Sequence, residues 1–141
     1  MTRCSISYEP CTGLYSEKGL RLLSKNLSGL YPLPFSSVEL RQEASSRAGK
    51  ISIQGVQPKL SASLNVKNKC FDLVDKNGHY ILKPQISDYP HVPENEDLTM
   101  RLAASAGIEV PLHGLLYGRD NELTYFIRRF DRTLKKLSCL K

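Results

Sequence analysis

Residues 60–66 alternate between apolar side chains at the even positions and serine or asparagine at the odd positions. A period of two is typical of a strand that buries one face and exposes the other. Two further apolar runs, 70–75 and 79–83, lie on either side of Asn77-Gly78. Because both central residues of a type I′ turn need positive φ, Asn-Gly predicts that these two runs pair as a hairpin.

The period changes over residues 93–107, where the spacing is that of a helix. Acidic residues occupy its first turn, and Gly107 ends it. Leu98, Leu102 and Ala106 recur at intervals of four, which gives this helix one apolar side. This segment is the clearest helix in the sequence.

Two apolar runs after this helix, 110–117 and 123–130, flank a polar segment at 118–122. This pattern predicts a second hairpin. From residue 51 onward the chain is therefore predicted to form strands with one inserted helix. The expected fold class is α+β, with an antiparallel sheet and one packed helix.

The first 50 residues are predicted to form a short helical leader. Residues 16–25 have the composition of a short helix. Ser36 and Glu39 have the S-x-x-E spacing of a capping box, which would open a helix that runs to about Ser46. The domains expected are a leader over 1–50, a sheet domain over 51–133 and a basic tail over 134–141.

Length and charge narrow the possible function classes. The chain has 141 residues, enough for one domain of ordinary size. Residues 128–141 hold six basic residues and one acid, and so carry +5 of the net charge of +6. Nucleic-acid binding needs basic residues spread over a surface, so DNA or RNA binding through this tail is the weakest hypothesis.

Other composition features exclude several kinds of site. No apolar run approaches the roughly 18 residues that cross a bilayer, and the start lacks the apolar core of a signal peptide, so we expect a cytoplasmic protein. The cysteines are single, which predicts no disulfide, and Cys4 and Cys11 have no second pair to complete a zinc site. His79, His91 and His113 have no partner at metal or catalytic spacing and are interpreted as surface or core-edge residues.

The small lobe of a protein kinase has this order of strands and helix. Three features of the sequence lie where such a lobe would bind ATP. Backbone N–H groups in the turn 54–59, which contains Gly55, can point at phosphate oxygens, although an ordinary hairpin turn is the alternative. Lys83 ends a strand as in the V-A-I-K motif, whose ammonium binds nucleotide phosphates, or is a solvated strand end. Glu96 could hold Lys83, or only complement the helix dipole.

A fourth candidate is the end of the last strand, residues 128–131. In a kinase small lobe this segment would be the hinge, where backbone groups bind the adenine edge and Phe130 packs beside the ring. The alternative interpretation is a cationic strand end.

The sequence from about residue 50 to 133 resembles the HipA-like serine/threonine kinases of bacterial toxin–antitoxin systems. It is most similar to the shorter HipT toxins of the three-component HipB-HipS-HipT type, and the first 50 residues look like the leader of HipT chains. The matching segments, in order, are Ser52–Lys59, Tyr80–Pro84, Tyr89–Glu96, Leu98–Ala103, Gly107–Pro111 and Arg129–Arg132.

The resemblance implies an ATP site in which a loop covers the nucleotide, Lys83 contacts the phosphates and Glu96 supports that lysine. It also implies that Ser52 is the autophosphorylated serine, where a phosphate would eject the loop. HipT chains often carry a second serine two residues later, where this chain has Gln54. The residues implied to bind ATP are Gln54, Gly55, Val56, Gln57, Pro58, Lys59, Lys83, Arg128, Arg129, Phe130 and, near the ribose, Asp131.

In this family a helical lobe that holds the catalytic aspartate and the Mg²⁺ ligands follows the R-F-D-R segment. This sequence stops nine residues after Arg132 and has no H-R-D-like or D-F-G-like stretch. We therefore expect a truncated kinase that is inactive alone, or a kinase whose missing lobe comes from a second chain.

The resemblance implies ATP and Mg²⁺ as cofactors and HipS-like and HipB-like antitoxins as partners. For intact members it implies a protein substrate from the translation machinery. The alternative is a non-catalytic interaction module that binds those antitoxins or a complete toxin. Direct binding to nucleic acid or to a membrane is not expected.

Overall fold

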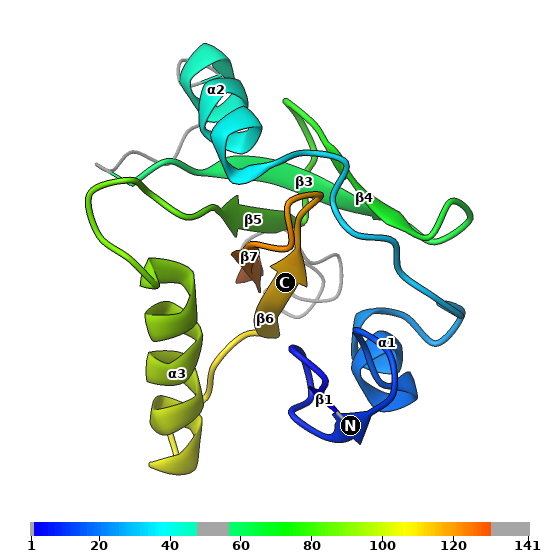
Figure 1. Ribbon diagram of the computed structural model, residues 1–141. Coiled ribbons are helices and arrows are strands. Elements are labelled where there is room, and N and C mark those ends of the chain that lie inside the picture. Colours follow the sequence, from blue (N-terminus) through cyan, green and yellow to red (C-terminus); the bar gives the residue numbers. More distant parts are fainter. Residues whose placement is uncertain (1, 48–56, 131–141) are drawn as a thin grey trace, which may run out of the picture.

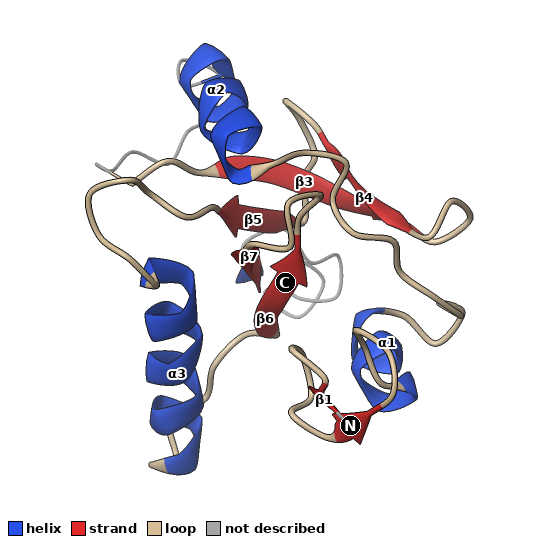
Figure 2. Ribbon diagram, viewed as in Figure 1, coloured by secondary structure: helices blue, strands red, loops and turns tan. Residues whose placement is uncertain are grey.

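The computed structural model describes residues 2–47 and 57–130 (Figures 1 and 2). This part of the chain has a mixed α+β fold, with three helices and a curled five-stranded antiparallel sheet. No helix within it has the length and apolar character needed to cross a bilayer. The elements are β1 (Thr2–Arg3), β2 (Pro10–Cys11), α1 (Glu17–Leu23), α2 (Ser37–Arg47), β3 (Leu60–Asn65), β4 (Cys70–Leu73), β5 (Tyr80–Lys83), α3 (Val92–Ser105), β6 (His113–Tyr117) and β7 (Leu123–Arg128).

The strands of the large sheet lie in the order β4-β3-β5-β7-β6, and every neighbouring pair is antiparallel. The helix α3 connects β5 to β6, so it follows the third strand of this sheet along the chain. β1 and β2 form a separate two-stranded sheet near the N-terminus. The predicted α+β class and antiparallel sheet are therefore confirmed.

The second predicted hairpin is confirmed and the first is wrong. Tyr117 of β6 pairs with Leu123 of β7 across the loop 118–122. By contrast, β4 and β5 do not pair with each other, because both pair with β3, which lies between them. The segment with Asn77-Gly78 therefore crosses from one side of β3 to the other.

Gly78 is required at this crossing for a different reason from the predicted one. Asn77 has a φ of 61°, but Gly78 does not have positive φ, so no type I′ turn forms. The Gly78 backbone instead lies directly on β3, where an added Cβ would be 2.0 Å from Ser61 Oγ. This contact buries Ser61, a position that the alternating pattern predicted to be solvated.

The two N-terminal helices begin as their sequence predicts. Ser16 accepts a hydrogen bond from the Gly19 N–H at 3.0 Å and caps α1. Ahead of α2, Ser36 Oγ accepts the Glu39 N–H at 3.2 Å, and Glu39 Oε1 accepts the Ser36 N–H at 2.8 Å. This reciprocal pair is the predicted capping box.

One face of the sheet carries the hydrophobic core. The N-terminal residues cover this face, and α2 lies over β3 at the top of Figure 1. Since side chains alternate along a strand, Tyr80 and Leu82 of β5 point into this core while Ile81 and Lys83 point to the opposite face. The buried core residues are Cys4, Ile6, Leu20, Leu23, Leu27, Leu33, Leu40, Ala44, Leu60, Ala62, Phe71, Tyr80, Leu82, Leu116 and Phe126.

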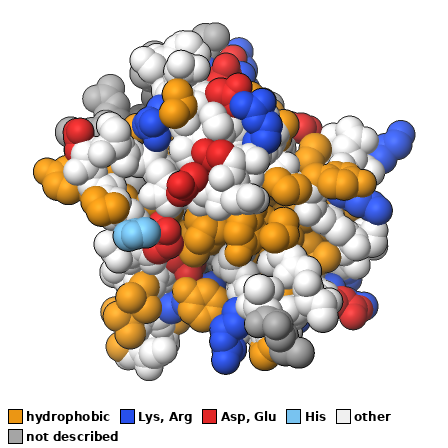
Figure 3. Space-filling view, in the orientation of Figure 1, with side chains coloured by type: hydrophobic (Ala, Val, Ile, Leu, Met, Phe, Trp, Pro, Cys, Tyr) orange, Lys and Arg blue, Asp and Glu red, His pale blue; other side chains and the backbone are white. Residues whose placement is uncertain are grey.

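The helix α3 covers the opposite face of the sheet, but it does not turn its predicted apolar side toward that face. Its only buried residues are Pro93 and Asp97. Leu98 and Leu102, which form the apolar side predicted from the sequence, are 49% and 61% exposed. Figure 3 shows hydrophobic side chains on the surface at the lower left, over α3. This helix therefore faces the sheet with Pro93, Asp97 and the half-buried Val92 and Met100, while its leucines point outward.

Candidate functional site

Lys83 and Glu96 form an ion pair on the face of the sheet that α3 covers. Lys83 is the last residue of β5, and Glu96 lies in the second turn of α3 because the helix begins at Val92. Lys83 Nζ donates to Glu96 Oε2 at 3.1 Å. The two side chains are 23% and 27% exposed, so the pair remains accessible to a ligand.

A pocket of about 370 Å³ opens beside this ion pair. Tyr125 and Ile127 of β7 form its floor, and Lys83 Nζ lies 5.9 Å from the centre of the Tyr125 ring. Burial and the nearby carboxylates of Glu96 and Asp97 raise the pKa of Tyr125, which keeps its hydroxyl neutral. The pocket is lined by Lys83, Val92, Asn95, Glu96, Thr99, Met100, Tyr125 and Ile127.

This arrangement can bind an anion beside an apolar surface. The Lys83 ammonium is held at one wall of the pocket. It can bind a negatively charged ligand that becomes partly buried there. Glu96 fixes the ammonium while leaving it two further N–H donors.

The connection between β5 and α3 is fixed by Gln85, which is buried. Its Nε2 donates to Glu94 Oε1 at 2.8 Å and to the Leu123 carbonyl at 3.0 Å. Arg41 of α2 donates to the Gln85 carbonyl at 2.8 Å. The start of α3 is thereby held relative to the end of β5, where the ion pair forms.

Asp97, the residue after the site glutamate, points into the protein and is fully buried. Its Oδ1 accepts a hydrogen bond from His113 Nδ1 at 2.7 Å. Its Oδ2 accepts hydrogen bonds from the Tyr8 hydroxyl at 2.9 Å and from Arg101 Nε at 2.8 Å. Burial alone would raise the pKa of Asp97, but the hydrogen bonds from His113, Arg101 and Tyr8 lower it overall.

Several residues implied by the resemblance lie outside the described part of the chain, namely Ser52, Gln54, Gly55, Val56 and Asp131. Gln57, Pro58 and Lys59 are described and directly precede β3. The Gln57 Nε2 atom is buried and has no hydrogen-bond partner among the described residues. Gln57–Lys59, the described part of the segment predicted to cover ATP, therefore holds a buried donor without a partner.

The Arg128 side chain points away from Lys83. Its NH2 donates to the Tyr80 hydroxyl at 2.7 Å and to the Leu23 carbonyl at 3.4 Å, on the core face of the sheet. The Arg129 side chain is buried, and the Arg129 N–H donates to the His79 carbonyl at 2.7 Å. Phe130 follows it and is 65% exposed.

The interpretation of the histidines holds for two of the three. His79 and His91 are exposed. His113 is instead buried beside Asp97, a partner sixteen residues away that spacing rules do not detect. In the described ranges, no three His, Cys, Asp or Glu side chains form a group that could hold a metal ion.

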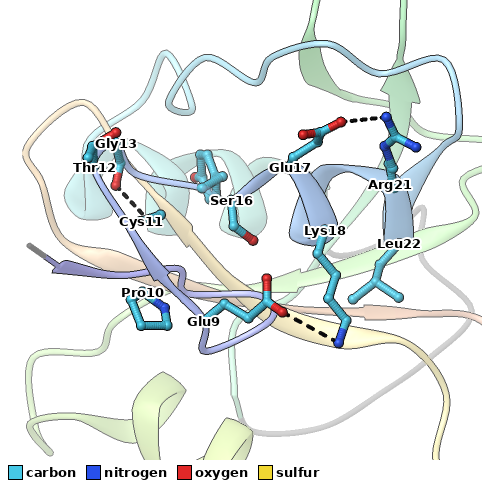
Figure 4. Close-up of a pocket in the computed structure, with 11 residues that line it drawn as sticks. Glu9, Pro10, Cys11, Thr12, Gly13, Ser16, Glu17, Lys18, Arg21 and Leu22 are labelled. Carbon is cyan, nitrogen blue, oxygen red and sulfur yellow. Dashed lines mark hydrogen bonds and ion pairs between the residues drawn. The ribbon is translucent and has the colours of Figure 1, made fainter.

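A larger, open hollow of about 850 Å³ lies near the N-terminus, between β2 and α1 (Figure 4). Its charged side chains pair with one another: Lys18 Nζ lies 3.7 Å from Glu9, and Arg21 pairs with Glu17. The Cys11 thiol donates to the Gly13 carbonyl at 3.1 Å. These pairs are largely exposed, with side chains 46–78% accessible, unlike the half-buried pair of Lys83 and Glu96, so we assign this hollow no ligand.

The pocket floor and the hydrogen-bond network around Asp97 could not be predicted from the sequence. Tyr125 and Ile127 occur in an apolar run that gives no sign of which residues face Lys83. Asp97 is one of several acids near the start of α3, and Tyr8 lies in the predicted leader. Only the register of β5 against β7 and the position of the N-terminal residues bring these groups together.

Comparison with known proteins identifies the family. Residues 51–140 match the family described as HipA-like C-terminal domain. Over 122 residues, which are 84% of this chain, the sequence is 41% identical to a Haemophilus influenzae protein named "Putative kinase". The chain spans 35% of the length of that relative. Because the family match covers well over half of its residues, the chain belongs to the family of HipA-like C-terminal domains.

Proposed function

We propose that this chain is the nucleotide-binding part of a HipA-like serine/threonine kinase of the HipT type. In this proposal Lys83 binds the phosphates of ATP in the pocket between β7 and α3, and Glu96 orients its ammonium. The observation that carries the proposal is the 3.1 Å pair between Lys83 and Glu96. The Haemophilus influenzae relative that is named "Putative kinase" supports ATP as the ligand.

The arrangement of the elements supports the same proposal. Protein kinases place the phosphate-binding lysine on the third strand of their small lobe and its glutamate on the following helix. Here Lys83 ends β5, the third strand of the sheet along the chain, and α3 follows with Glu96. A kinase small lobe is therefore the interpretation that accounts for both residues and for the order of the elements.

The described residues fit ATP better than they fit Mg²⁺. The pocket combines the Lys83 ammonium with an apolar floor, as a nucleotide requires. No acidic cluster among the residues with described positions could bind a metal. We therefore assign ATP to this site and no metal-binding role to these residues.

ATP binding is tested by titrating the chain with a fluorescent ATP analogue. Lys83→Ala removes the ammonium and is expected to weaken binding by about tenfold or more. Lys76→Ala, at an exposed position, is the matched control and should bind as the unmodified protein does. Equal affinity of Lys83→Ala and Lys76→Ala, or no binding by the unmodified chain, would contradict the proposal.

The autophosphorylation of Ser52 is a further part of the proposal. A phosphate adds close to two negative charges near the ATP phosphates, so it should lower ATP affinity. Ser52→Asp places one negative charge there, and Ser52→Ala places none. We expect Ser52→Asp to bind the fluorescent analogue more weakly than Ser52→Ala does; equal binding would argue against this role.

Binding of HipS-like or HipB-like antitoxins is a second candidate function. The exposed Leu98 and Leu102 favour it, since they give the surface apolar residues suited to a protein contact. Co-purification with such antitoxins that persists in Lys83→Ala would separate partner binding from nucleotide binding. Loss of the complex in Leu98→Ser but not in Lys83→Ala would locate the contact on α3.

A further inference from the structure

Residues Cys4–Glu9 form a turn, here called the N-terminal turn, that is bound to the edge of the large sheet. Ser5 makes two hydrogen bonds with Leu115 of the edge strand β6. The Leu115 N–H donates to the Ser5 carbonyl at 3.1 Å, and the Ser5 hydroxyl donates to the Leu115 carbonyl at 2.6 Å. Gly114 permits this approach, because a Cβ there would lie 3.3 Å from the Ile6 Cα.

The other side of the N-terminal turn contacts α3. The Tyr8 hydroxyl donates to the buried Asp97, and Arg101 NH2 donates to the Ile6 carbonyl at 2.7 Å. The Arg101 guanidinium also lies 3.5 Å from the centre of the Tyr8 ring, within cation–π range. The turn therefore connects the edge strand to α3 at two positions one helical turn apart.

These contacts matter because the leucines of α3 face solvent. Its only fully buried side chains are those of Pro93 and Asp97, and Val92 and Met100 are half-buried. The pair between Lys83 and Glu96 is partly exposed, and an ion pair of that kind is too weak to fix the position of a helix. Hydrogen bonds to a buried carboxylate are stronger, so Asp97 is the better anchor.

We propose that the N-terminal turn is a clasp that positions Glu96 against Lys83. Tyr8, Asp97 and Arg101 act as positioning residues, since none of them lines the pocket. Glu96 and Asp97 are consecutive on α3, so hydrogen bonds that hold the Asp97 side chain set the rotation of the helix that presents Glu96. The proposal rests on the proposed function and extends the site to a segment more than seventy residues away from Lys83.

The clasp is tested first without nucleotide, by labelling lysines with an amine-reactive ester and measuring each site by mass spectrometry. A paired ammonium reacts more slowly than an unpaired one, so Glu96→Gln should speed labelling of Lys83. Tyr8→Phe removes only the hydroxyl that reaches Asp97, and we expect it to speed Lys83 labelling by about threefold or more. Labelling of the exposed Lys67 should not change.

The combined variant Tyr8→Phe with Glu96→Gln distinguishes positioning from general loosening. If the clasp acts through Glu96, Tyr8→Phe adds no further gain in Lys83 labelling once the carboxylate is gone. Tyr31→Phe, which removes a hydroxyl from a ring that is 65% exposed, is the matched control and should leave Lys83 labelling unchanged. Unchanged Lys83 labelling in Tyr8→Phe, or an equal gain with and without Glu96, would overturn the proposal.

Nucleotide binding gives the second readout. Tyr8→Phe should weaken binding of the fluorescent ATP analogue in the unmodified background and have no further effect in Glu96→Gln. If the chain binds no nucleotide at all, the proposed function fails, while the labelling result still decides whether the clasp positions Glu96. Asp97→Asn, compared with Asp88→Asn at an exposed position, provides an independent variant at the other end of the Tyr8 hydrogen bond, and it too should speed Lys83 labelling.

Discussion

Tyr8 and Asp97 are 89 residues apart in the sequence, and the Tyr8 hydroxyl lies 2.9 Å from Asp97 Oδ2. The tyrosine has a φ of 66°, an uncommon backbone conformation for a residue other than glycine. Burial and the hydrogen bond to Asp97 raise the pKa of the Tyr8 hydroxyl, so it remains a donor at neutral pH. The contact joins the N-terminal segment to α3 through a buried charge.

This buried charge makes the fold sensitive to acid. The pKa of Asp97 is lower in the folded chain than in the unfolded one, so ionised Asp97 stabilises the fold above the ordinary aspartate pKa of about 3.9. That stabilisation is lost as the pH falls from this value through the lower folded-state pKa. The groups that face Asp97 are Tyr8, Arg101, His113 and Tyr125.

We expect the free energy of unfolding of the unmodified chain, measured in urea, to fall steeply on acidification below about pH 4. Asp97→Asn should be less stable at neutral pH by about 2–4 kcal/mol, because the amide cannot accept all three hydrogen bonds. It should also lose less stability on acidification. If the free energy of unfolding fell by the same amount on acidification in both proteins, ionised Asp97 would not stabilise the fold as expected.

The exposed leucines of α3 lead to a prediction about stability. Leu98→Ser and Leu102→Ser should each change the free energy of unfolding by no more than about 0.5 kcal/mol, since both side chains lie largely in solvent. Leu82→Ala, in the core face of β5, should cost about 2–5 kcal/mol. Urea unfolding measures both effects, and comparable losses would mean that the leucines of α3 are buried.

Local patterns predicted the parts of this fold that local contacts determine. The capping box before α2 depends on two residues three positions apart, and the hairpin of β6 and β7 needs only a short loop. Asn77-Gly78 wrongly predicted a hairpin of β4 with β5, because the turn preference of these two residues is local. The position of β3 between β4 and β5 is set by pairing along the whole sheet. Tertiary pairing overrode the turn preference.

The same division applies to the candidate site. Lys83 and Glu96 were predicted because each occupies a defined place on a strand and a helix, and 3.1 Å separates them in the fold. Their role in binding ATP stays a prediction. Asp97 and His113 form their pair only after α3 packs on β6, and no spacing in the sequence encodes that contact.

Gly78 provides a test of the corrected strand order. Gly78→Ala places a Cβ 2.0 Å from Ser61 Oγ and 3.1 Å from the Ala62 backbone, so it should destabilise the fold by about 1–3 kcal/mol. Gly13→Ala is the matched control, because a Cβ there meets nothing within 4 Å. Thermal unfolding of the two variants measures the difference. A Gly78→Ala protein as stable as Gly13→Ala would place this segment away from β3.

Ile127 and Arg128 are neighbours on β7 whose side chains point to opposite faces of the sheet. Ile127 lines the pocket beside Lys83, whereas the Arg128 guanidinium donates to the Tyr80 hydroxyl on the core face. Ile127→Ala should therefore weaken binding of the fluorescent ATP analogue by about threefold or more, through lost apolar contact. Arg128→Met should leave nucleotide affinity unchanged and lower the free energy of unfolding by about 1–2 kcal/mol, because the buried Tyr80 hydroxyl loses its partner.

The two variants need the same pair of measurements, since each is expected to change a different quantity. Nucleotide affinity at one fixed salt concentration and unfolding in urea separate the two effects. A loss of affinity in Arg128→Met with no change in Ile127→Ala would contradict this placement and would favour a nucleotide contact by Arg128, one of the residues that the resemblance implies line the adenine. The expected result instead places the nucleotide against the Ile127 face of β7, beneath the ion pair formed by Lys83 and Glu96.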